Sequence, residues 1–333
     1  MQRAPHERIL KNVGWNLFCE LWLLAMAFFA TPFIVRSLTA DLYGIYALIL
    51  IVIGYFYFLQ FGLGTASVKY IAGYLAANDG PNARKIFWSC LLAYFFIGIL
   101  GASAIAAMSR PLVLYFFKIG PEYSEPAIYC LRISSVGFFV SILTAAVCSI
   151  LRAAERFDIL SGVGVISGTL QILAAVSLLK SGFSIKEMVA ATVSVQALVL
   201  AVFSCVTFRI FPYIRKTLFD KKSLGKLLKF GSFIAVSGAV NPVLQNIEKI
   251  FLTALGSLST LTYYYIPYNL TSKLQIAPSA LSGAIFPAFS SFQASRDDNA
   301  NRQLYFRSTL YLALFSAFFA AFVLLFGGDF LRV

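Results

Sequence analysis

The sequence predicts an all-α polytopic membrane protein, and two observations carry this prediction. Of the 333 residues, 59% are hydrophobic and only 12% are charged, against roughly 45–50% and about 25% in soluble domains. The apolar residues also gather in segments that reach about 20 residues, the length that a helix needs to cross a bilayer. So little polar surface excludes a soluble enzyme, a disordered chain and a fibrous protein.

Nine apolar segments meet the length requirement for a membrane span. They lie near residues 13–35, 43–63, 86–108, 128–150, 159–179, 187–208, 231–254, 262–287 and 308–327. The segments are too long for strands and lack the alternating pattern of an outer-membrane barrel. Because backbone groups in hydrocarbon must be satisfied internally, we expect about nine transmembrane helices. The first apolar run continues past Ala27, so we expect no cleaved signal peptide.

Basic residues predict the orientation of these helices. If the N-terminus is cytoplasmic, every inner segment carries more Lys and Arg than the outer loop that follows it. This asymmetry is the positive-inside signal of multi-pass membrane proteins. The most basic inner segment, residues 209–230, is therefore interpreted as an orientation signal and a contact for anionic lipid, and we expect no nucleic-acid partner.

A weak internal repeat divides the chain into two lobes. Leu10-Lys11 before the first span recurs as Leu228-Lys229 before the seventh. At the same offset, Asp79, Arg84 and Phe87 recur as Asp297, Arg302 and Tyr305. Six spans separate the two copies, so both enter the membrane in the same direction, as in a parallel repeat. We predict a six-helix N-terminal lobe (1–208), a basic cytoplasmic linker (209–230) and the first three helices of a C-terminal lobe (231–333), which we expect to be truncated.

Cysteine and histidine give no sign of a metal or redox site. The cysteines all fall within predicted spans and form no Cys-x-x-Cys pair, so they are interpreted as small core hydrophobes. They are Cys19, Cys90, Cys130, Cys148 and Cys205. His6, the single histidine, lies in the basic N-terminal tail. We expect no catalytic residue, no metal and no cofactor, and hence a protein that is not an enzyme.

Several short motifs follow one another along the chain in a characteristic order. They are LYGIYAL (42–48), FGLGTASVKY (61–70), LRAAERF (151–157), NIEKIFL (246–252), YYYIPYNL (263–270) and FP (286–287). Together they resemble the oligosaccharide flippase, or polysaccharide transporter, family of the multidrug/oligosaccharidyl-lipid/polysaccharide (MOP) exporter superfamily. The resemblance implies a MATE-like architecture of two six-helix lobes that alternate between inward- and outward-open states in the bacterial inner membrane. It implies a polyprenyl-diphosphate-linked oligosaccharide as substrate. Membrane lipids, a coupling ion (H⁺ or Na⁺) and polysaccharide-assembly proteins are the other candidate partners.

Polar residues inside the predicted spans are the candidates for a substrate site, because a charge within a bilayer is costly and usually faces a cavity or a partner. The candidates are Lys273, Lys249, Glu248, Gln245, Asn241, Asn269, Glu20 and Asn16. Three of the span 7 candidates share one helical face, with Lys249 beside them. Lysine offers three donors to phosphate oxygens, amides can bind sugar hydroxyls, and a glutamate can bind a coupling cation or hold a lysine in place.

Other interpretations of these residues and of the whole chain stay open. Lys273 could pair with a carboxylate such as Glu248, and Lys249 could extend to the outer interface. A cation-coupled multidrug exporter of the same superfamily would need acidic residues deep in its N-terminal lobe, where only Glu20 is available. A membrane glycosyltransferase or polysaccharide polymerase would need long loops with clustered carboxylates, which the sequence lacks.

Overall fold

The computed structural model describes residues 5–60, 62–272 and 298–331, and every regular element in these ranges is helical. The α-helices are α1 (Pro5–Phe56), α2 (Leu63–Ala76), α3 (Gly80–Pro111), α4 (Pro121–Ala153), α5 (Phe157–Lys180), α6 (Ile185–Ile210), α7 (Lys221–Leu255), α8 (Leu258–Ser272) and α10 (Asp298–Leu331). Short helical turns connect some of them: η1 (Tyr57–Gln60), η2 (Leu112–Phe116) and η3 (Pro212–Arg215). The prediction of an all-α protein is confirmed for these residues.

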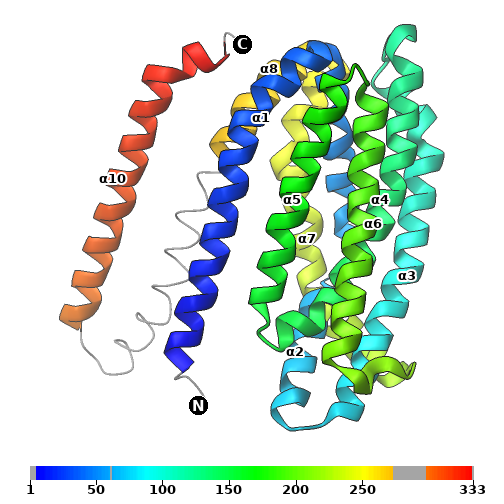
Figure 1. The fold of residues 1–333 in the computed structure, drawn as a ribbon, viewed down its shortest axis with the longest axis vertical. Coiled ribbons are helices and arrows are strands. Elements are labelled where there is room, and N and C mark those ends of the chain that lie inside the picture. Colours follow the sequence, from blue (N-terminus) through cyan, green and yellow to red (C-terminus); the bar gives the residue numbers. More distant parts are fainter. Residues whose placement is uncertain (1–4, 61, 273–297, 332–333) are drawn as a thin grey trace. The chain divides into compact units, whose positions relative to one another are not determined.

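Helix α1 contains the first two predicted spans, joined by a kink. Thr39, in the stretch predicted to link the spans, has φ 67° and ψ 158°, which are not helical values. A positive φ is uncommon for a residue with a side chain, and it breaks the regular path of the helix. Figure 1 shows α1 changing direction at its upper end. The chain therefore turns between two spans within a few residues.

The second predicted span, residues 43–63, ends near its predicted boundary, because the apolar stretch stops at Gln60 and a break follows at Gly62. Gly62 has φ 62°, a left-handed conformation that glycine adopts without a side-chain penalty. Helix α2 starts at the next residue, and Gly62 offers no side chain to cap it. Tyr94 of α3 takes over this role. Its hydroxyl oxygen accepts a hydrogen bond from Gly64 N at 2.7 Å, and it donates to Gln60 O at 3.2 Å.

The described chain divides into two compact units. One comprises Phe18–Tyr263, and the other comprises Met1–Leu17 together with Tyr264–Val333. In the larger unit α4 is central and contacts α2, α3, α5 and α6. In the smaller unit, Tyr264 stacks on Tyr268 within α8. The predicted lobe boundaries at 208 and 231 stay a prediction.

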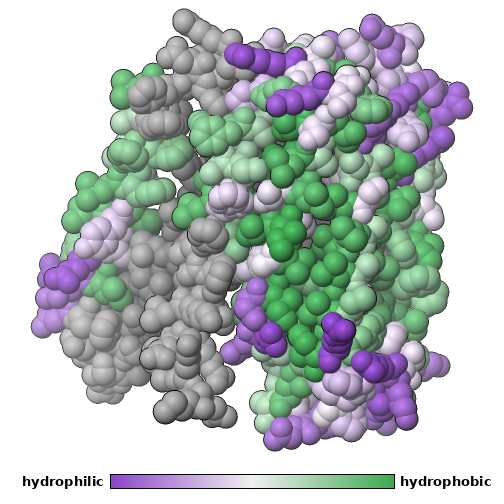
Figure 2. Space-filling view, viewed as in Figure 1, coloured by the Kyte–Doolittle hydropathy of each residue, from purple (hydrophilic) through white to green (hydrophobic). Residues whose placement is uncertain are grey.

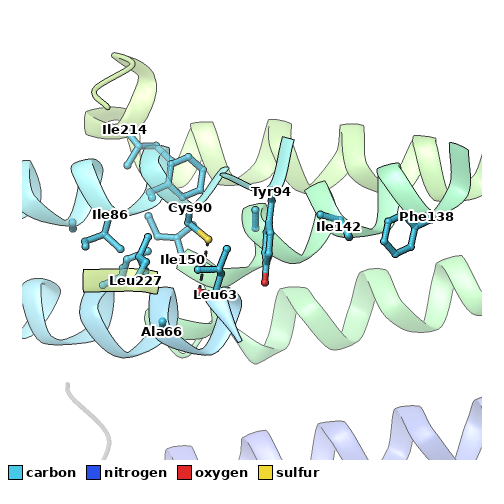
Figure 3. Close-up of a cluster of buried hydrophobic side chains, with 14 of the residues drawn as sticks. Leu63, Ala66, Ile86, Cys90, Tyr94, Phe138, Ile142, Ile150, Ile214 and Leu227 are labelled. Carbon is cyan, nitrogen blue, oxygen red and sulfur yellow. Dashed lines mark hydrogen bonds between the residues drawn. The ribbon is translucent and has the colours of Figure 1, made fainter. Parts of the chain in front are cut away.

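Close packing of α3 against α4 forms the core of the larger unit. Figure 3 shows Tyr94 of α3 and Phe138, Ile142 and Ile150 of α4 among the buried side chains of this core. Gly101 of α3 permits the approach, because a Cβ at this position would collide with the Phe138 ring. Small residues serve the same purpose at helix interfaces in membranes, where close backbone approach replaces a hydrophobic driving force.

The described helices include six stretches that are long and apolar enough to cross a membrane. They are Leu21–Gln60, Gly80–Phe116, Pro121–Ala153, Phe157–Lys180, Ile185–Ile210 and Arg302–Ala321. The first holds two predicted spans. Figure 2 shows hydrophobic residues over the middle of the larger unit and hydrophilic residues toward both of its ends. The predicted seventh span lies in α7 and part of the eighth in α8; residues 273–287 lie outside the described residues.

Candidate functional site

Helix α7 carries a charged side chain in the interior of the protein. Lys249 is only 1% exposed, although α7 is one of the predicted spans. Its Nζ atom donates to Asn246 Oδ1 at 2.8 Å and lies 3.4 Å from Glu248 Oε1. A buried ammonium is costly unless it has such partners. The side chain therefore lies inside the protein and does not extend to the interface, the alternative that the sequence left open.

Asn246, Glu248 and Lys249 together form what we call the α7 cluster. Asn246 lies three residues before Lys249 and so shares its helical face. Glu248 differs from Lys249 in environment, because its side chain is 36% exposed. The cluster thus combines a buried cation, an amide and a more accessible carboxylate.

The start of α8 packs closely against the part of α1 that follows the kink. Thr262 Oγ1 donates to Ala40 O at 2.6 Å, across more than 200 residues of sequence. A Cβ on Gly44 would collide with the Leu258 carbonyl, so only glycine allows the backbones of α1 and α8 to approach this closely. Leu261 is fully buried in the same contact region. Residues near the beginning and the end of the larger unit are therefore joined directly.

Of the remaining sequence-predicted candidates, the structure describes the side chain of Asn269 alone. Asn269 is half-buried in α8, where its carbonyl accepts from Ser272 Oγ at 2.8 Å. It belongs to the smaller compact unit. The side chains of Asn16, Glu20, Asn241 and Gln245, and the whole of Lys273, lie outside the described residues. Their roles stay predictions.

One residue of the α7 cluster, Asn246, is missing from the sequence-predicted set. Asn246 could have been found from its spacing of three residues from Lys249, which places both on one helical face. Among the described residues, no group of three or more His, Cys, Asp and Glu side chains is arranged to hold a metal ion.

Comparison with known proteins identifies the relatives of this chain. Residues 33–333 match the family described as "Polysaccharide biosynthesis protein". A candidate O-antigen transporter from Shigella flexneri is 22% identical over 304 residues, which cover 89% of this chain and 70% of the relative.

Solved structures of similar fold are MOP superfamily transporters. An inward-facing multidrug resistance MATE family transporter aligns with a TM-score of 0.76 at 16% identity, over 92% of this chain and 70% of that chain. An outward-facing conformation aligns with a TM-score of 0.69 at 17% identity, over 98% and 74%. A MOP superfamily transporter from Pyrococcus furiosus aligns with a TM-score of 0.65 at 16% identity, over 96% and 73%. At these identities the likeness shows the fold alone, and it confirms the predicted MATE-like architecture.

Proposed function

Because this multi-pass membrane protein belongs to the Polysaccharide biosynthesis protein family, we propose that it moves a lipid-linked oligosaccharide across the membrane for the synthesis of a cell-surface polysaccharide. The observation that carries the proposal is the family match, which spans residues 33–333. The 22% identity to a candidate O-antigen transporter supports it. So does the MATE-like fold, in which the solved relatives are transporters. The protein translocates its substrate and performs no covalent chemistry on it.

The proposed mechanism is alternating access between the two predicted lobes, 1–208 and 231–333, in the bacterial inner membrane with the N-terminus in the cytoplasm. The substrate headgroup is a diphosphate, which must cross a region of low dielectric constant. Lys249 is suited to attract it, because a buried ammonium forms strong charge-assisted hydrogen bonds to phosphate oxygens. Glu248, within 3.4 Å, neutralises the ammonium between substrates or takes up a coupling H⁺ or Na⁺.

Roles in substrate binding are also proposed for the other sequence-predicted candidates. Lys273 would add a second cation for the diphosphate, and the amides of Asn241, Gln245 and Asn269 would bind sugar hydroxyls. Glu20 and Asn16 would contribute from the first span. Polysaccharide-assembly proteins would receive the translocated glycan.

Lys249→Met tests the proposal, because methionine is unbranched and nearly as long as lysine but lacks the ammonium group with its charge and its hydrogen-bond donors. Loss of a hydrogen bond to a charged group costs about 1.5–3 kcal/mol, so we expect transport of a fluorescent polyprenyl-diphosphate-linked oligosaccharide in proteoliposomes to fall by roughly 10- to 100-fold. Lys180→Met, which neutralises an exposed lysine at the end of α5, is the matched control. Normal transport by Lys249→Met at a normal protein level would refute the role of Lys249.

A cation-coupled multidrug exporter is the second candidate, and the likeness to MATE family multidrug transporters favours it. The same proteoliposomes distinguish the two functions. An exporter would exchange an organic cation such as ethidium for H⁺ or Na⁺ when an ion gradient is imposed, and it would leave the lipid-linked glycan in place. A glycosyltransferase or polymerase would instead change the mass of the glycan.

A further inference from the structure

The residues that follow α6, including the first turns of α7, are fixed to neighbouring helices, although the sequence predicts them as a linker. We call residues 212–229, which end with the first nine residues of α7, the α6–α7 segment. Trp88 Nε1 of α3 donates to Ile214 O at 2.8 Å. One residue further along α3, Ser89 Oγ accepts from Asp220 N at 3.3 Å and lies 3.2 Å from Asp220 O. Figure 3 shows Ile214 and Leu227, both fully buried, beside the side chains of α3.

The first turns of α7 are also held in place. Asp220 caps the helix, because its carboxylate accepts from Ser223 N at 2.9 Å and from Ser223 Oγ at 2.7 Å. Just beyond the segment, the Phe230 ring packs edge to face on Tyr70 of α2, and Lys69 Nζ lies 3.9 Å from its centre. The segment is therefore an ordered part of the larger unit. Its inner side, with Ile214 and Leu227, packs against neighbouring helices, and its outer side is exposed.

The outer side of the segment is strongly cationic. Six basic side chains are exposed there: Arg215, Lys216, Lys221, Lys222, Lys226 and Lys229. Asp220 is the only acidic residue between positions 209 and 230, and its carboxylate is occupied with Ser223. The ion pairs found in the described part of the chain, Arg156–Asp158 and Glu248–Lys249, involve none of these six cations. Within the described residues, no ion pair neutralises the positive charge of the segment.

Large apolar side chains are exposed among these cations. Tyr213, Phe219 and Leu228 are 36%, 44% and 46% exposed. The segment also follows directly after α6, one of the stretches able to cross a membrane. Aromatic and basic side chains at the end of a span are typical of the membrane interface, where the rings lie at headgroup level and the cations meet lipid phosphates. An acidic soluble partner would satisfy the cations but would not account for the exposed rings.

We propose that the α6–α7 segment is a binding site for anionic phospholipid. Its lysines contact the headgroup phosphates, and Tyr213, Phe219 and Leu228 lie against the glycerol and upper acyl chains. This site is separate from the α7 cluster and does not depend on which substrate the protein transports. The docking on α3 holds the cations in a fixed arrangement, so that binding a lipid does not first require the segment to order.

The test measures how far short-chain lipids raise the melting temperature of the full chain in a neutral detergent. The probes are dioctanoyl phosphatidylglycerol, dioctanoyl phosphatidylcholine, glycerol phosphate and inorganic phosphate. We expect the anionic lipid to stabilise the protein and the other three probes to have little effect. Because each lysine near an anionic lipid surface strengthens the attraction substantially, Lys216→Gln/Lys221→Gln/Lys222→Gln should weaken the apparent affinity for phosphatidylglycerol by roughly tenfold or more.

A matched variant removes three lysines from other places in the chain. Lys118→Gln/Lys180→Gln/Lys186→Gln lowers the net charge equally and should keep the phosphatidylglycerol response. An equal loss in both triple variants would overturn the proposal, because it would show a diffuse effect of net charge. An unchanged response in the α6–α7 variant would also overturn it. Stabilisation by inorganic phosphate alone would show a free-phosphate site and would also overturn the proposal. A melting temperature equal to that of the wild type in the absence of lipid confirms that both variants fold.

Discussion

Tyr94→Phe removes a single oxygen atom that links α3 to the start of α2. In the wild-type protein this hydroxyl accepts from Gly64 N at 2.7 Å and donates to Gln60 O at 3.2 Å. Tyr94 is only 1% exposed, so water cannot easily replace the lost oxygen. Gly62, at the N-cap, has no side chain that could take over. The variant therefore leaves one backbone donor and one backbone acceptor without this partner.

The size of the effect follows from these two groups. An unsatisfied buried polar group costs about 1–3 kcal/mol, but interhelical hydrogen bonds in a membrane protein average only about 0.6 and reach about 1.7 kcal/mol. We expect Tyr94→Phe to lower the free energy of unfolding by about 1–2 kcal/mol. The ring itself stays, so packing against the α3–α4 core is unchanged.

The assay is unfolding of the purified protein in mixed micelles, with a rising mole fraction of sodium dodecyl sulfate and helicity followed by circular dichroism. Tyr74→Phe is the control, because its hydroxyl makes an exposed 3.3 Å contact with Lys226. Loss of such a surface contact should change the free energy of unfolding by no more than about 0.5 kcal/mol. If Tyr94→Phe is as stable as the wild type, or no worse than Tyr74→Phe, the capping role of Tyr94 is wrong.

Two further predictions concern stability, the first measured by the same unfolding in sodium dodecyl sulfate and the second by thermal melting as a function of pH. Gly101→Ala places a Cβ against the Phe138 ring and should destabilise the protein by about 1–3 kcal/mol. Gly73→Ala is the control and should not destabilise the protein, because a Cβ at this position meets no neighbouring atom within 4 Å. Equal losses of stability in the two variants would contradict the packing argument. Hydrogen bonds from the Ser223 side chain and backbone hold the pKa of Asp220 below its ordinary value of 3.8. The contribution of the Asp220 carboxylate to stability is therefore present above that value and is lost as the pH falls through the lowered pKa. Asp220→Asn should flatten the fall in melting temperature below about pH 4. The same fall in melting temperature in the variant and the wild type would contradict this.

Features that depend on local composition could be predicted from the sequence. Apolar runs of about 20 residues require helices, whatever the rest of the chain does, because lipid offers no hydrogen-bond partner to the backbone. Lys249 and Glu248 could be named for the same reason, since a charge in such a run is rare. The burial of Lys249 could not be predicted, because it depends on how α7 packs against α2, α3 and η1, which are distant in the sequence.

The contacts between helices, including those that hold the chain at its breaks, were decided by the tertiary structure. The kink at Thr39 joins two predicted spans in one helix, and the break at Gly62 depends on a hydroxyl from Tyr94, some 30 positions later in the chain. The basic segment after α6 illustrates the same division. Its charge and its place between apolar runs are visible in the sequence, but its docking rests on Trp88 and Ser89, more than 120 residues earlier.

The sequence by itself thus determined that this protein lies in a membrane, that it is helical and to which family it belongs. These properties follow from composition and from short motifs in a characteristic order. The tertiary structure alone decided which charges are buried and which face outward. Lys249 is enclosed with Asn246 and Glu248, whereas the lysines of the α6–α7 segment remain exposed. The physical reason is that the cost of a charge depends on the dielectric around it, and α7 packs against α2, α3 and η1, which are distant in the chain.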